Sequence, residues 1–186
     1  MTLKEMKQKV LGMIEELNKD SEFLTDDPDI QNKINDVINQ VQYELARMKK
    51  IPDYVELEVS EGDLIRFEDI TDASGYEVYQ LNIVRGVDYD LKASGTIIKA
   101  LGNGTVEVDY FRYPELINSK TTGSYEFELS ADALEIMPYG VAADLLKSDV
   151  SANYGQIYSQ RYETMLQRLD PRYAMGSITV EGGVNI

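Results

Sequence analysis

Two pairs of acidic residues are the best spaced in this 186-residue chain to do chemistry: Asp88 with Asp90, and Glu107 with Asp109. Each pair sits at alternate positions of a strand-like pattern, and alternation places both side chains on one face of a strand. Two neighbouring carboxyl groups, one protonated and one ionised, carry out glycoside hydrolysis. A solvent-exposed strand face has the same pattern, and we favour that simpler interpretation.

Histidine and cysteine are both absent from the sequence. Histidine is the usual general base at neutral pH, and cysteine supplies thiol nucleophiles and many zinc and iron ligands. We therefore expect no enzymatic activity, no cofactor and no metal. Asp26, Asp27 and Asp29 could belong to a calcium loop, but Pro28 occupies an early position and the required glycine is missing. We expect them to cap a helix instead.

Charge is unevenly distributed along the chain. The formal net charge is −15, and residues 51–129 alone carry 16 acidic and 6 basic residues. Polyanion binding depends largely on lysine and arginine neutralising phosphates, so simple nucleic-acid binding is disfavoured. No apolar run approaches membrane-spanning length, and residues 1–5 lack a signal-peptide pattern. These features predict a soluble protein made in the cytoplasm.

Apolar periodicity changes along the chain and divides it into parts. Residues 2–18 are expected to form a helix whose first turn has a capping box of Thr2 and Glu5. A second helix is expected from Asp27-Pro28 to Ile51-Pro52. Alternating patterns then predict strands at 54–59, 64–67, 76–83, 87–91, 96–100 and 105–113. Gly102-Asn103-Gly104 between the last two is expected to form a tight hairpin.

The C-terminal third returns to helical periodicity. Ser130 is expected to cap a helix that Pro138 breaks or restarts near Met137. Gly140 either permits close helix approach or is only a weak helix former. A last helix is expected at 153–169. In the tail, polar residues alternate with Ile178 and Val180, which is typical of an extended segment. This segment could pair with its own sheet, pair with a neighbour's edge, or fray into solvent.

These elements predict an α+β fold. Residues 1–52 and 130–170 would form an antiparallel bundle of about four helices. Residues 53–129 would form an inserted, small antiparallel β-sandwich or barrel, and residues 171–186 an extended C-terminal tail.

Two local patterns stand out against this order of elements. The strand end Tyr110-Phe111-Arg112-Tyr113-Pro114 has the form Tyr-x-Arg-x-Pro, and a later helix contains Gly140-Val141-Ala142-Ala143-Asp144-Leu145-Leu146. Residues 106–114, 129–146 and 162–172, in this arrangement, resemble the head–tail connector (adaptor, or neck) proteins of tailed bacteriophages and prophages. The β insertion is larger than in the purely helical adaptors.

This resemblance implies a structural virion protein that forms an oligomeric ring under the portal, extends the DNA channel and joins head to tail. The implied partners are the portal protein, neighbouring copies of the chain and a tail or stopper protein. DNA would pass through the ring without specific binding, and no membrane is involved. The implied location is the neck of the virion, after synthesis in the bacterial cytoplasm.

The resemblance also implies that the C-terminal tail grips the portal or neighbouring subunits. The residues expected at this interface are Arg172, Tyr173, Ser177, Ile178, Thr179, Val180, Val184 and Ile186. Two alternatives remain open. One is another virion structural protein, such as a tail terminator or a capsid accessory protein. The other, less favoured, is a nucleic-acid-binding β module.

Overall fold

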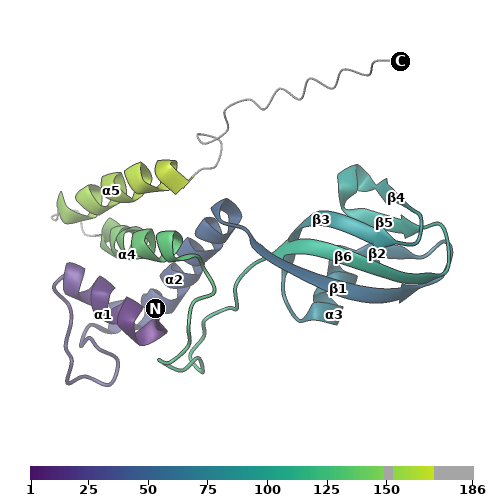
Figure 1. The fold of residues 1–186 in the computed structure, drawn as a ribbon. Helices are drawn as coiled ribbons and strands as arrows, with labels where there is room; N and C mark the ends of the chain where they lie inside the picture. Colours follow the sequence, from purple (N-terminus) through teal and green to yellow (C-terminus); the bar gives the residue numbers. More distant parts are fainter. Residues whose placement is uncertain (149–152, 170–186) are drawn as a thin grey trace, which may run out of the picture.

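A computed structural model describes residues 1–148 and 153–169, which form a mixed α+β fold (Figure 1). The helices are α1 (Leu3–Met13), α2 (Pro28–Met48), α3 (Phe67–Ser74), α4 (Ala131–Leu145) and α5 (Asn153–Leu169). The strands are β1 (Ile51–Val59), β2 (Leu64–Arg66), β3 (Val78–Gly86), β4 (Tyr89–Lys92), β5 (Ile97–Ala100) and β6 (Gly104–Arg112). Short 3₁₀ turns occupy Ala93–Gly95 and Leu146–Ser148.

The two N-terminal helices begin where the sequence predicts. Thr2 and Glu5 form the expected capping box at the start of α1. At the start of α2, the Asp27 carboxylate accepts hydrogen bonds from the backbone N–H groups of Asp29 and Ile30. The prediction that this aspartate caps a helix is therefore confirmed. Helix α1 ends earlier than expected, because Glu15 adopts a φ of 63°, which is incompatible with a right-handed helix.

The strands form two three-stranded antiparallel sheets, in the orders β1-β6-β3 and β2-β5-β4. Val106, Val108 and Tyr110 alternate along β6 and are buried. They pack with Ile65 of β2, Ile98 of β5 and other residues in a cluster shared by both sheets, here called the β cluster. Of the two predicted arrangements, residues 51–112 adopt two sheets with a shared core and not a closed barrel.

The predicted hairpin at Gly102-Asn103-Gly104 is wrong. Strand β5 pairs with β2 and β4, whereas β6 pairs with β1 and β3, so this turn carries the chain from one sheet to the other. The Asn103 side chain accepts a hydrogen bond from the Glu61 N–H at 2.8 Å and so ties the turn to the one after β1. The Asn-Gly signal therefore marked a turn but not strand pairing.

Helix α3 was not predicted. The sequence pattern extends the second strand to Phe67, but the chain turns into a helix there, and Asp69 accepts a hydrogen bond from the Arg66 N–H at its start. Ile70 is fully buried in the β cluster. Gly75, with a φ of 80°, ends the helix in the left-handed conformation that suits glycine.

Helix α4 runs through Pro138, contrary to the prediction of a break. A proline inside a helix costs about 3 kcal/mol because it removes a hydrogen bond and crowds the preceding turn. Met137 and Val141 on either side are fully buried, and each buried apolar side chain contributes about 1.5–3 kcal/mol. Packing on α1, α2 and α5 therefore outweighs the proline.

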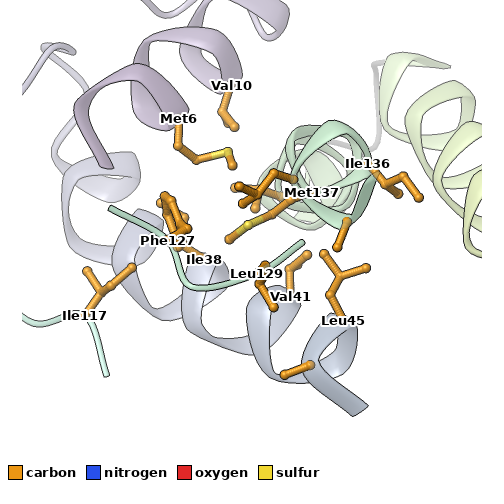
Figure 2. Packing of buried hydrophobic residues seen from close by; sticks show 14 of the residues in the cluster. Met6, Val10, Ile38, Val41, Leu45, Ile117, Phe127, Leu129, Ile136 and Met137 are labelled. Atoms are coloured by element: carbon orange, nitrogen blue, oxygen red, sulfur yellow. The ribbon is translucent and has the colours of Figure 1, made fainter. Parts of the chain in front are cut away.

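A second cluster, here called the helical cluster, lies among α1, α2, α4 and α5 (Figure 2). Met6 of α1, Ile38 of α2 and Met137 of α4 are fully buried in it. Ile117, Phe127 and Leu129 from the segment between β6 and α4 also pack there, as do Ile51 and Tyr113. Much of the segment 113–129, assigned above to the β module, thus packs with the helices.

Within 1–148 and 153–169, no helix combines the length and the apolar character that crossing a membrane requires.

Candidate functional site

One face of β6 carries the predicted carboxylate pair, Glu107 and Asp109. Arg85 of β3 forms ion pairs with both, at 2.8 Å from Asp109. Hydrogen bonds with Glu107 and then with Asp109 raise the pKa of Arg85. Both carboxylates are thus engaged by one guanidinium from the neighbouring strand, whereas glycoside hydrolysis needs two carboxyl groups that face a substrate. The two side chains share a face as predicted, but their arrangement is that of a cross-strand ion-pair group.

The other predicted pair separates in the structure. Asp90 lies in β4 and forms an ion pair with Lys92 at 2.9 Å. Asp88 precedes the strand, and its backbone carbonyl accepts a hydrogen bond from the Leu101 N–H. Both side chains are exposed. The structure therefore brings these carboxylates to no common site.

Arg112, at the end of β6, forms the centre of the junction between the two clusters. Its guanidinium lies 2.8 Å from Asp53 of β1 and 2.7 Å from Glu128, just before α4. The ring of Tyr76 stacks against it at 3.7 Å. Burial opposes the charge, but the hydrogen bonds with Glu128 and Asp53 outweigh it, and the pKa of Arg112 is raised. This arginine stays charged and fastens β1 and β6 to the lead-in to α4.

Three tyrosines from α2, β3 and the end of β6 extend the junction. The rings of Tyr43 and Tyr113 stack at 4.5 Å, and Tyr79 packs on Tyr113 at 4.8 Å. The Tyr79 hydroxyl donates to the Ala46 carbonyl at 2.9 Å, and Arg47 donates to the Tyr113 hydroxyl at 2.6 Å. Offset aromatic contacts add to the area they bury. The first sheet is therefore held against the C-terminal half of α2.

Tyr79 gives the junction a measurable pH dependence. Burial, and then the neighbouring Tyr113, raise the pKa of Tyr79 from 10.0 to about 12. Because the unfolded chain ionises this phenol first, the stability it contributes is complete below pH 10 and is lost between pH 10 and about 12. Tyr79→Phe is expected to reduce that alkaline loss of stability. At neutral pH it is expected to lower the free energy of unfolding by about 1 kcal/mol, because the hydrogen bond to the Ala46 carbonyl is missing.

Urea denaturation at neutral pH and midway between those two pKa values measures this effect. Tyr54→Phe is the control, since Tyr54 is 63% exposed. An equal alkaline loss of stability in the Tyr79 variant and the parent protein would contradict the prediction.

Two polar residues on the buried face of α2 hold the segment that follows the junction. The Asn39 side chain donates to the Ile117 carbonyl at 2.7 Å and accepts from the Ile117 N–H at 2.9 Å. Gln42 donates to Asn39 and to the Glu115 carbonyl. Neither residue is among those predicted from the sequence. Their position beside Val41, inside an apolar stripe, was the available signal, because buried amides need partners.

A cavity of about 310 Å³ with three lysines in its lining lies beside the N-terminal half of α1. Here called the lysine pocket, it is lined by Leu3, Lys4, Lys7, Lys19, Ser21, Glu22, Phe23, Leu24, Thr121 and Gly123. None of its lysines forms an ion pair with any residue in 1–148 or 153–169. Lys7 is half-buried, and burial lowers its pKa. Its lining has three lysines and one carboxylate, Glu22, so in a chain of net charge −15 this pocket is a local excess of positive charge.

The residues predicted at a partner interface fall outside this description. Arg172, Tyr173, Ser177, Ile178, Thr179, Val180, Val184 and Ile186 all follow Leu169, the last residue that the structure describes. Their role stays a prediction.

Comparisons with known proteins add no family to this description. No protein-family model matches the chain, and a search of curated proteins finds no match.

Proposed function

We propose that this chain is a structural virion protein of the neck of a tailed bacteriophage, where it forms a ring under the portal and joins head to tail. What carries the proposal is the order of elements: two helices, a block of strands that also contains the short helix α3, and two further helices. Arg112, the arginine of the Tyr-x-Arg-x-Pro strand end, lies at the turning point of that order. The arginine of this pattern, on which the resemblance partly depends, is thus also the residue that joins the β cluster to the helical cluster.

In this proposal, α1, α2, α4 and α5 act as one antiparallel bundle, with α4 as its central member. Helix α4 contacts each of the other three. Tyr162 of α5 donates to Glu44 of α2 at 2.7 Å, and Tyr158 donates to the Met13 carbonyl at the end of α1. A ring subunit must keep a fixed shape so that successive copies meet at the same angle, and these links together with the junction supply it.

The sheets offer surfaces for contact between copies. Strands β1 and β3 are the outer strands of one sheet, and β2 and β4 those of the other. Unpaired strand edges are ready templates for pairing with another chain. Tyr54 on β1 and Leu91 on β4 are 63% and 53% exposed, which adds apolar area beside two of these edges. An extended tail from residue 171 onward would be a suitable strand to add.

The acidic surface agrees with a channel through which DNA passes without being held. A net charge of −15 repels a polyanion at distances within the Debye length, so DNA bound through phosphate contacts is disfavoured. In this proposal the protein is made in the host cytoplasm and ends in the virion neck, with the portal and a tail or stopper protein as its partners.

Electron microscopy of the purified protein mixed with its cognate portal tests the proposal. The expected result is a ring of this protein stacked on the portal ring. A folded protein that never associates with the portal, at concentrations well above those of virion assembly, would count against the proposed function.

Deletion of residues 177–186 provides the matched variant. It is expected to leave the subunit folded, with an unchanged circular dichroism spectrum, and to weaken ring formation on the portal, because the tail would grip a partner. If the isolated subunit instead loses its thermal stability, the tail belongs to its own sheet, and the predicted interface residues are wrong.

A further inference from the structure

The lysine pocket and the far end of the β strands have opposite charges. The far end is made of the turns at residues 60–63, 87–88 and 101–103, here called the distal turns. Hydrogen bonds from Gly62 to Ala100, from Leu101 to Asp88 and from Glu61 to Asn103 hold them together. Glu61, Asp63 and Asp88 are all exposed there. The distal turns are therefore a compact acidic surface.

Apolar side chains accompany the charges on both surfaces. Leu64 and Leu101 are 44% and 43% exposed at or beside the distal turns, and Phe23 is 59% exposed at the lysine pocket. Exposed apolar groups among charges are typical of contact surfaces, where the apolar groups add burial and the charges set orientation.

The two surfaces of one chain lie too far apart to meet. The β1–β6 register runs from Ile51 paired with Arg112, beside the helices, to Val59 paired with Gly104 at the distal turns. Nine residues of strand span about 30 Å, and Figure 1 shows the strands extending away from α1. Any contact between the two surfaces must join different copies.

We propose that the lysine pocket binds the distal turns of a second copy of this chain, with Lys4, Lys7 and Lys19 facing Glu61, Asp63 and Asp88. The contact uses different surfaces on the two copies, so it repeats from copy to copy and closes into a ring when the rotation allows. Lys7 is half-buried and has no carboxylate partner among residues 1–148 and 153–169, and a carboxylate from the neighbouring copy would supply one. The inference rests on the proposed function for the ring, but the contact itself is a property of the free protein.

Cross-linking between copies tests the contact, since the natural chain has no cysteine. One copy carries Glu22→Cys at the lysine pocket and a second, with a size tag, carries Leu101→Cys at the distal turns. A short bismaleimide is expected to join the two copies at low salt. The yield of heterodimer is expected to be several-fold higher than for a control pair in which Asp36→Cys, at an exposed acid on α2, replaces Glu22→Cys. Equal yields for the two pairs would overturn the inference.

Charge reversal then tests the proposed residues. Changing Lys4, Lys7 and Lys19 to Glu in the pocket copy is expected to lower the heterodimer yield about tenfold, since each exposed ion pair contributes a factor of roughly two in affinity. Changing Glu61, Asp63 and Asp88 to Lys in the other copy is expected to restore it. If the reversed pocket copy fails to fold, salt replaces it: the parent pair must lose its advantage over the control at high ionic strength. A yield that neither reversal nor salt changes would overturn the inference.

The two proposals fail in different ways. If the protein forms a ring on the portal but the two copies do not cross-link, the inferred contact is wrong and the proposed function still holds. If the two copies cross-link but the protein never binds the portal, the inferred contact holds and the proposed function is wrong.

Discussion

Replacing Arg112 with methionine is expected to lower the free energy of unfolding by about 2–3 kcal/mol. Removing one partner of a buried ion pair costs about 3–5 kcal/mol, because the remaining charge is left without a counter-ion. Here the remaining carboxylates, Asp53 and Glu128, keep 31% and 26% of their side chains exposed, and water reduces the cost. Urea denaturation followed by circular dichroism measures the change.

Arg85→Met is the matched control for this prediction. Arg85 also contacts two carboxylates, but its side chain is 51% exposed, and exposed ion pairs contribute about 0–1 kcal/mol. If both substitutions cost the same, Arg112 does not hold the two clusters together. The Arg112 variant is also expected to expose the junction tyrosines to solvent, whereas the Arg85 variant is not.

Gly140→Leu is expected to cost about 3 kcal/mol and to separate α5 from α4. A Cβ at Gly140 would lie 2.8 Å from Cε2 of Tyr162, a ring that is 9% exposed and bonded to Glu44 through its hydroxyl. Overpacking a core costs about 1–3 kcal/mol, and leucine adds more atoms than this contact allows. Thermal or urea unfolding measures the loss. The 2.8 Å separation from Tyr162 confirms close helix approach as the role of Gly140, out of the two roles predicted for it.

Gly12→Leu is the internal comparison for the same substitution. Gly12 lies in α1, where the one atom of residues 1–148 and 153–169 within 4 Å of an added Cβ belongs to Leu17, at 3.9 Å. Leucine is the better helix former, so this variant is expected to be neutral or more stable by about 0.5 kcal/mol. In a double-mutant cycle, Tyr162→Ala should relieve much of the cost of Gly140→Leu. Additive effects would contradict a direct clash.

The features that the sequence predicted depend on neighbouring residues. The capping box at Thr2, the cap at Asp27 and the alternation along β6 each follow from residues within one turn or one strand. The wrong predictions are at positions whose structure depends on contacts with residues far away in the sequence. Pro138 stays inside α4 because three helices pack around it, and the turn at Asn103 bonds to Glu61, 42 residues away, so no local signal distinguishes a hairpin from a passage between sheets.

At the candidate site too, local features could be predicted from the sequence and the partners from distant elements could not. Alternation correctly placed Glu107 and Asp109 on one face, but Arg85, which pairs with them, comes from another strand. Arg112 was found only as part of a motif, and its partners Asp53 and Glu128 are 59 and 16 residues away. The lysine pocket combines α1 with residues near 20 and near 121, so only the folded chain reveals its charge.

The placement of α4 after the strands has a consequence for synthesis on the ribosome. The buried faces of α1 and α2 meet α4, yet roughly 80 residues separate the end of α2 from its start. At about 5–20 residues per second, both helices wait about 4–16 s for their partner. The strands emerge during that interval and can complete their own core, whereas the apolar faces of α1 and α2 stay open to chaperones. Translation speed across residues 49–130 is therefore expected to govern the yield of folded protein.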